Sequence, residues 1–96
     1  MNDVYRAISD PTRRRILRLL RERDMSAGDI AANFTQAWPT ISGHLGVLKD
    51  AGLVHADRRG TSISYHLNVS VLEEAMIALL EALGIGSAER PPGKQP

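Results

Sequence analysis

The fold is decided by Ala37-Trp-Pro-Thr-Ile-Ser-Gly-His-Leu-Gly-Val-Leu-Lys-Asp-Ala-Gly-Leu-Val54. At about 100° per residue, Ile41, Leu45 and Leu48 fall on one stripe of a helix predicted over residues 38–51. The opposite stripe carries glycines and small polar residues, whereas an exposed helix face normally carries long charged side chains that favour helix. This bare face indicates a helix that lies close against another surface, although glycines are also tolerated on surfaces that bind nothing.

A hairpin is predicted directly after this helix, which Gly52 ends as a left-handed cap. Residues 54–58 and 61–67 are short β-branched segments on either side of the turn Arg59-Gly60. Two arginines, Arg58 and Arg59, lie at its tip and are typical of a loop that holds a DNA minor groove or its phosphates. A solvated turn is the alternative for the hairpin alone. Beside a bare helix, the hairpin favours a major-groove recognition helix with a basic wing.

The candidates for DNA contact lie on the bare helix face, at the hairpin tip and at the start of an upstream helix. They are Thr12, Arg13, Trp38, Pro39, Thr40, Ser42, Gly43, Gly46, Lys49, Arg58 and Arg59. Thr40 and Ser42 are expected to reach base edges or phosphates. Trp38 either packs against the preceding helix or lies along the DNA backbone or a thymine methyl group. His44, at the edge of the buried stripe, is expected to be a structural histidine.

Three helices are predicted before the recognition helix. The first covers residues 1–9, where apolar residues recur at helical spacing. Asp10-Pro11 is an N-cap followed by proline at the first helical position, and it starts a second helix that reaches Arg23. Ser26-x-x-Asp29 resembles a capping box and opens a short third helix over residues 28–34.

The segment from Arg6 to Arg23 carries seven arginines and two acidic residues, although the whole chain has a formal net charge of only +1. This basic pole either attracts a polyanion or is a solvated helix face.

A last helix is predicted over residues 71–83, after the capping box Ser70-x-x-Glu73, and it is apolar over more than half of its circumference. A chain of 96 residues is too small to bury both sides of such a helix, so a second copy is the expected cover. The predicted homodimer interface includes the first helix and consists of Val4, Tyr5, Ile8, Leu72, Met76, Leu79, Leu80 and Leu83. A coiled-coil-like or membrane-surface role is the alternative, although the glutamates of this helix oppose binding to an anionic membrane.

The predicted fold class is mostly α with a β-hairpin wing, a winged helix-turn-helix of order α-α-α-α-β-β-α. Residues 1–85 form one DNA-binding and dimerisation domain, and residues 86–96 form a disordered tail. The chain has no cysteine, which excludes disulfides, thiolate metal sites and cysteine nucleophiles. Because it shows neither a signal-peptide pattern nor an apolar run long enough to span a bilayer, a cytoplasmic protein is expected.

Several motifs together carry a resemblance to a known family: Ala7-Ile-Ser-Asp-Pro-Thr-Arg-Arg-Arg-Ile-Leu17, Ile30-Ala31, Thr40-Ile-Ser-Gly-His-Leu45, Leu48-x-x-Ala-Gly-Leu-Val54 and Arg58-Arg59-Gly60. They resemble the ArsR/SmtB family of bacterial winged-helix repressors. The first motif, with Met25-Ser-Ala-Gly-Asp-Ile30, is most similar to the SdpR branch, whose members repress their own operon beside a membrane protein. The resemblance implies a homodimer, formed by the first and last helices, that binds an inverted-repeat operator.

The chain departs from this family pattern at three points. Gly43 stands where a histidine is frequent, so the direct contacts to bases are expected to be fewer or to lie at other positions. Ala37 replaces a common capping serine, which costs about 1 kcal/mol at that helix start. The third helix lacks the cysteine pair of the arsenic and cadmium sensors, and the last helix contains no histidine. No metal and no other cofactor is therefore expected. His55 and His66 lie on the two hairpin strands, but two histidines without a carboxylate or thiolate are weak evidence for a metal.

The expected function is sequence-specific repression of transcription, centred on the protein's own operon, by a homodimer bound to double-stranded DNA without a metal effector. Release is expected from a partner such as a membrane protein, or from a small ligand. The alternative is a winged-helix module that binds an acidic protein through the same elements. An enzyme is not expected, because the three histidines and scattered acids form no nucleophile–base spacing and no phosphate loop.

Overall fold

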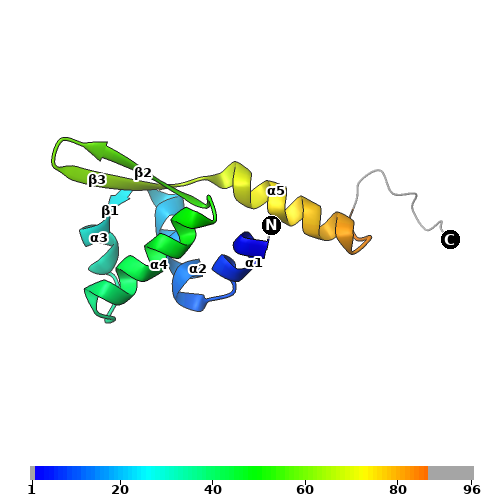
Figure 1. Ribbon diagram of the computed structural model, residues 1–96, viewed down its shortest axis with the longest axis horizontal. Coiled ribbons are helices and arrows are strands. Elements are labelled where there is room, and N and C mark those ends of the chain that lie inside the picture. Colours follow the sequence, from blue (N-terminus) through cyan, green and yellow to red (C-terminus); the bar gives the residue numbers. More distant parts are fainter. Residues whose placement is uncertain (1, 87–96) are drawn as a thin grey trace.

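The computed structural model describes residues 2–86 and places five helices and three strands in that range. In chain order they are α1 (Asn2–Ile8), α2 (Pro11–Glu22), β1 (Met25–Ser26), α3 (Ala27–Ala31), α4 (Trp38–Asp50), β2 (Val54–Arg59), β3 (Ser62–Leu67) and α5 (Val69–Ala82). The β2–β3 hairpin projects from one side of the helical body and α5 from the other (Figure 1). The predicted winged helix-turn-helix is confirmed, while the tail predicted over residues 86–96 lies, apart from Gly86, outside the described residues.

The predicted order of elements omitted β1. This two-residue strand pairs antiparallel with β3, with Met25 opposite Tyr65, and gives a sheet of order β1-β3-β2. Met25 is only 5% exposed, so the short strand also anchors the sheet to the core. Two residues are too few to show the alternation that predicts a strand, and the sequence therefore gave no signal for it.

The hairpin has the predicted position and turn. Its register runs from Val54 opposite Leu67 to Arg59 opposite Ser62. Gly60 has a φ of +62°, a conformation that glycine adopts without steric cost, which explains the turn at this position.

The core is formed mainly by the apolar stripes of α2 and α4. Ile16 of α2 and both Ile41 and Leu48 of α4 are completely buried, as their helical spacing predicts. Ile30 of α3 joins them from the side. Only Ala75 of α5 is fully buried, so α5 rests on the core by one narrow face.

Two of the three predicted N-terminal helix caps are confirmed. A carboxylate oxygen of Asp10 accepts a hydrogen bond from the Arg13 N–H at 3.0 Å, and the Ser26 hydroxyl accepts one from the Asp29 N–H at 3.1 Å. The prediction for Ser70 is wrong: α5 begins at Val69, and the Ser70 hydroxyl donates to the Asn68 side chain at 3.2 Å.

A backbone hydrogen bond precedes the start of α5. The N–H of Asn68 donates to the carbonyl of Leu53 at 2.9 Å, which fixes the chain direction directly after β3.

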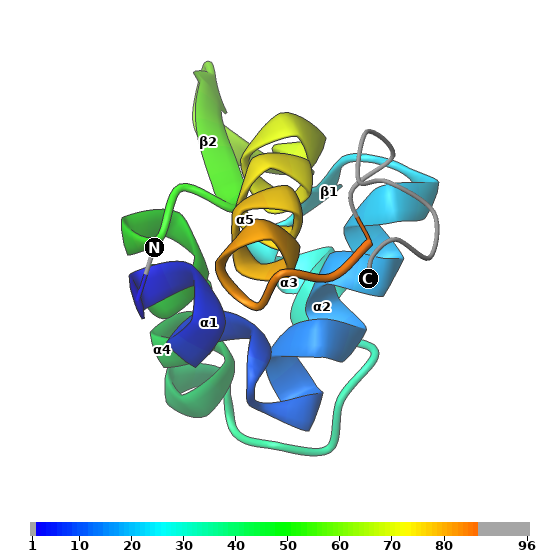
Figure 2. The same cartoon turned by 90° about the vertical axis from the view of Figure 1, so that its right-hand side faces the viewer.

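Figure 2, which looks along α5 from its C-terminal end, shows α1 and α2 beside the helix. None of the helices within residues 2–86 has both the length and the apolarity needed to cross a bilayer.

Candidate nucleic-acid interface

Helix α4 turns its bare face to solvent. Ile41, Leu45 and Leu48 are buried, and every residue of α4 predicted to contact DNA is exposed. These exposed residues are Trp38, Pro39, Thr40, Ser42, Gly43, Gly46 and Lys49. The predicted division of α4 into a core face and an outward face is therefore confirmed.

The two glycines of α4 have no packing role inside the chain. A Cβ atom added at Gly43 or at Gly46 would meet nothing within 4 Å, and neither residue has a positive φ. Each glycine costs about 1 kcal/mol of helix stability relative to alanine. Neither internal packing nor backbone conformation explains this cost, so the open backbone is a surface feature of the helix.

The first turn of α4 has no side-chain cap and is exposed to solvent. Ala37 occupies the N-cap position and makes no side-chain cap, as its sequence predicts. Trp38 is 51% exposed, so it is not a core residue. A half-exposed tryptophan beside Thr40 leaves a flat apolar surface at the start of the helix.

The side chain of Arg13 contacts α1 and α4. Its guanidinium donates to the carbonyl oxygens of Ala7 and Arg6 at 2.7 and 2.9 Å, and a third nitrogen lies 3.2 Å from His44 Nδ1. These contacts join α1, α2 and α4. They use three of the five N–H groups of the guanidinium, so the DNA contact of Arg13 stays a prediction, whereas the prediction of His44 as a structural residue is confirmed.

Asp10 lies beside both Arg13 and His44. The hydrogen bond from the Arg13 backbone N–H lowers the pKa of the Asp10 carboxyl, and the nearby His44 and Arg13 side chains act in the same direction. The carboxylate oxygen lies 4.0 Å from His44 Nδ1, so the cap of α2 also borders α4.

Thr12 is tied to the turn before α4. Its hydroxyl accepts a hydrogen bond from Gln36 Nε2 at 3.0 Å, and the residue is half-buried. Two further arginines of the basic pole also serve the fold: Arg14 donates to the Ile8 carbonyl at 2.9 Å, and Arg15 donates to the Asn33 carbonyl at the same distance. Part of the basic pole is therefore used to hold loops.

The tip of the wing carries the predicted cations. Arg58 and Arg59 are both exposed at the end of β2. Successive side chains of a strand point to opposite faces, so the two guanidinium groups extend from both sides of the hairpin. Within residues 2–86, no hydrogen bond or ion pair is found for either side chain.

Helix α5 exposes a broad apolar face. Ile77, Leu80 and Leu83 are 56%, 42% and 61% exposed, and Val69 and Ile85 are about half exposed as well. Large apolar side chains that are exposed together mark a surface for a partner. The predicted interface omitted Ile77, Val69 and Ile85, although Ile77 is three residues before Leu80 and shares its side of the helix.

Other predicted interface residues face their own core. Val4 is only 6% exposed because α1 turns this side chain inward, so it offers almost no surface to a partner. The half-buried residues that pack against the core are Tyr5, Ile8, Leu72 and Met76. Leu79 is half-buried too. The outward face of α5 is thus centred on Ile77 and Leu80.

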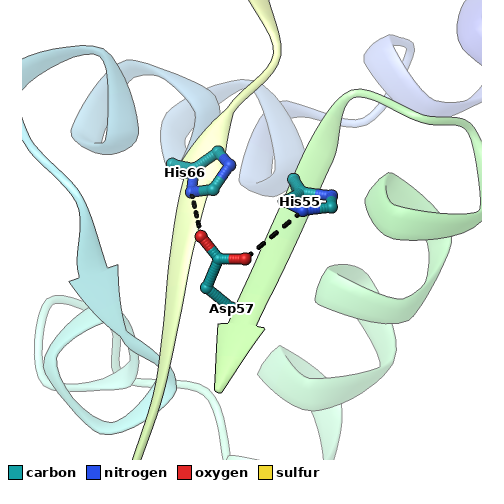
Figure 3. A group of neighbouring side chains, drawn as sticks. All are labelled: His55, Asp57 and His66. Carbon is teal, nitrogen blue, oxygen red and sulfur yellow. Dashed lines mark ion pairs between the residues drawn. The ribbon is translucent and has the colours of Figure 1, made fainter. Parts of the chain in front are cut away.

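A histidine–aspartate cluster lies on the wing, as Figure 3 shows. His55 Nε2 and His66 Nδ1 lie 3.4 and 3.7 Å from the two carboxylate oxygens of Asp57. The sequence-based argument that the two histidines lack a carboxylate is therefore wrong. The signal was the spacing His55-x-Asp57, which places both side chains on one face of a strand.

A helix-turn-helix followed by a β-hairpin, with a bare helix and a basic tip, defines the winged helix-turn-helix class of DNA-binding proteins. The pattern of the "Bacterial regulatory protein, arsR family" matches residues 10–56. The chain is 48% identical to the "Transcriptional repressor SdpR" of Bacillus subtilis (strain 168), over 90% of this chain and 96% of that protein. The chain therefore belongs to the arsR family of bacterial regulatory proteins.

Solved structures agree with this assignment. An "ArsR-like Transcriptional Regulator from Rhodococcus sp. RHA1" has a TM-score of 0.79 at 32% identity, with 86% of this chain and 75% of that chain covered. A possible ArsR-family regulator from Mycobacterium bovis, solved by NMR as a "homodimeric winged helix-turn-helix DNA-binding domain", has a TM-score of 0.70 at 29% identity. That comparison covers 84% of this chain and 76% of the other.

Proposed function

We propose that the protein is a sequence-specific transcriptional repressor in which α4 enters the major groove and the β2–β3 wing follows the adjacent backbone. The observation that carries this proposal is the exposed face of α4, where Gly43 and Gly46 leave the backbone open. A helix without long side chains can approach base edges closely, so that Thr40 and Ser42 reach them. Arg58 and Arg59 supply charge for phosphates or for the minor groove.

The functional unit in this proposal is a homodimer. The exposed face of α5, centred on Ile77 and Leu80, is large and apolar, and a symmetric copy would cover it. The homodimeric domain from Mycobacterium bovis supports this arrangement. Two α4 helices related by a two-fold axis match an inverted-repeat operator.

The natural operator in this proposal is the DNA upstream of the protein's own gene, in the cytoplasm. The similarity to the repressor of Bacillus subtilis supports repression as the outcome. The proposal includes no metal effector for operator binding.

Release of repression follows from a membrane protein or a small ligand that engages the dimer. A hollow of about 460 Å³ beside the base of α5 supports the second route. Its lining includes Leu17, Leu67 and Leu72, together with the charged residues Arg14, Arg18, Arg21 and Glu22. A small amphipathic ligand would match this combination of apolar and charged side chains.

The test is fluorescence anisotropy with labelled DNA from upstream of the gene, across a salt series, with and without a zinc chelator. We expect nanomolar affinity that falls steeply with salt and is the same in both conditions. Unrelated DNA of the same length is the control. Equal affinity for both DNAs, or none for either, would contradict the proposal and favour a protein partner for the same surface.

A further inference from the structure

The side of the wing that faces away from the core carries a group of side chains for which DNA binding gives no role. The register explains how they meet: His55 and Asp57 are two apart on β2, and His66 of β3 is directly opposite His55. Because side chains two apart share a face of a strand, all three lie on one side of the hairpin. We infer that His55, Asp57 and His66 form a binding site for a divalent transition cation of the zinc class.

The spacing of the candidate ligand atoms fits such an ion. Bonds of about 2.0–2.1 Å in a tetrahedral site place neighbouring ligand atoms roughly 3.3–3.4 Å apart. The distances from Asp57 to His55 Nε2 and to His66 Nδ1 are 3.4 and 3.7 Å. One candidate ligand atom from each of the three residues lies within 4.8 Å of the other two. Small side-chain rotations therefore suffice to bring all three onto one ion.

The histidine rings are already arranged around the carboxylate. Their centroids are 4.8 Å apart and the ring planes are inclined by 44°, so they are not stacked flat against each other. Both rings turn a nitrogen toward Asp57, from different strands (Figure 3). His55 faces Oδ1 of Asp57 and His66 faces Oδ2, so the three side chains already lie together, and an ion between them would replace these two ion pairs.

The chemistry of the donors selects the kind of ion. Imidazole suits zinc, copper, nickel and iron, whereas magnesium and calcium are held mainly by oxygen ligands. Two imidazoles and one carboxylate leave a fourth tetrahedral position open to water. The side chains of His55, Asp57 and His66 are 63%, 45% and 29% exposed, so an ion can enter from solvent.

A bound ion would join the outer strand of the wing to the central one. Among the described residues 2–86, β2 has a sheet neighbour on one side only, whereas β3 lies between β1 and β2. The ion would link His55 and Asp57 of β2 to His66 of β3 and so restrict opening of the hairpin. This site is independent of the proposed contacts of α4 with DNA.

The experiment uses the untagged, metal-free, full-length chain in the absence of DNA. Binding of Zn²⁺ is measured by calorimetry, binding of Co²⁺ by visible absorption, and the unfolding midpoint is recorded with and without Zn²⁺. The variants are His55→Gln, Asp57→Asn and His66→Gln. The matched control is Asp24→Asn, which changes an exposed aspartate in the loop between α2 and β1.

We expect the native chain and the control to bind one ion per chain with a tetrahedral Co²⁺ spectrum. Each cluster variant should bind at least about 10-fold more weakly, because loss of even an outer-shell partner of a metal ligand typically costs that much. Zn²⁺ should raise the unfolding midpoint of the native chain and the control, and much less that of the variants. Absence of binding to the native chain would overturn the inference. So would equal binding by the native chain and Asp57→Asn, since circular dichroism can verify that this exposed-site variant is folded. Neither result depends on the proposed repressor function.

Discussion

Helices α4 and α5 each leave one face uncovered in the single chain, and the two faces are opposite in chemistry. The outward face of α4 holds glycines and short hydroxyl side chains, and its backbone is open at Gly43 and Gly46. The outward face of α5 holds large apolar side chains, with Ile77 56% exposed. The first face favours close approach to a polar groove, and the second requires cover from water.

The difference shows that exposure alone does not identify a partner. Helix stability explains neither face, because glycine weakens α4 and uncovered isoleucine gains nothing for α5. In the proposed function each face has its own partner, DNA for α4 and a second chain for α5. The following substitutions test whether α4 contacts DNA and α5 contacts a second chain.

The largest effect is expected from the double substitution Ile77→Glu and Leu80→Glu. Charges on the outward face of α5 should give monomers, and the affinity for an inverted repeat should fall by about 100-fold or more because two half-sites are no longer held together. Sedimentation and anisotropy measure the two effects. The control is Glu74→Gln, an exposed change on the same helix. A double variant that stays dimeric would remove this face from the interface.

Filling the open face of α4 should have opposite effects on stability and binding. Gly43→Ala and Gly46→Ala should each raise the free energy of unfolding by about 1 kcal/mol, because a Cβ there meets nothing. Operator affinity should nevertheless fall, by roughly tenfold, if the backbone lies against base edges. Denaturant unfolding and anisotropy measure the two quantities. Gly28→Ala in α3 is the control, which should stabilise without loss of affinity, and unchanged affinity in all three would make the bare face irrelevant to DNA.

A smaller effect is expected at the wing. Arg58→Ala and Arg59→Ala should each weaken binding several-fold for all DNA sequences alike, and each should reduce the salt slope by about one. Anisotropy on specific and unrelated DNA at several salt concentrations measures this. Arg21→Ala, at an exposed arginine paired with Glu22, is the control. Full affinity in both wing variants would show that the hairpin does not contact DNA.

The smallest effect is expected at Asp10, the N-cap of α2, which lies beside Arg13 and His44. Asp10→Ala removes the cap of α2 and should lower the free energy of unfolding by about 1 kcal/mol. Because the pKa of Asp10 is lowered in the folded chain, this contribution is present above the ordinary aspartate pKa and is lost as the pH falls through the lowered value. Denaturant unfolding at a series of pH values should show native and variant converging in acid. Ser26→Ala removes a cap without an ionisable group, so its deficit should not depend on pH, and parallel behaviour of the two variants would contradict the assignment.

The sequence predicted those parts of the molecule that depend on local pattern. The stripe of Ile41, Leu45 and Leu48 defined α4 and its outward face, and Gly60 defined the turn of the wing. Features set by contacts distant in sequence could not be predicted. β1 exists only because Met25 meets Tyr65.

In the candidate sites, too, the features that depend on contacts distant in sequence could not be predicted. A bond from Asn68 to Leu53 precedes α5, and the contacts of Arg13 depend on α1 and α4 lying beside it. Asp57 was overlooked as a partner of His55 and His66 because its carboxylate becomes relevant only when β2 and β3 are in register.

The hydrogen bond between Asn68 and Leu53 has a mechanical consequence. It joins Asn68, directly before α5, to Leu53, which lies between α4 and β2, and two methyl carbons of Val71 lie 3.9 and 4.0 Å from the position that a Cβ atom would take at residue 52. The first turn of α5 therefore contacts the segment that follows α4. In a symmetric pair, a rotation of α5 against its counterpart would change the separation of the two α4 helices, and with it the length of operator that fits. An inducer would then need only to tilt one helix pair, without touching any group that faces DNA.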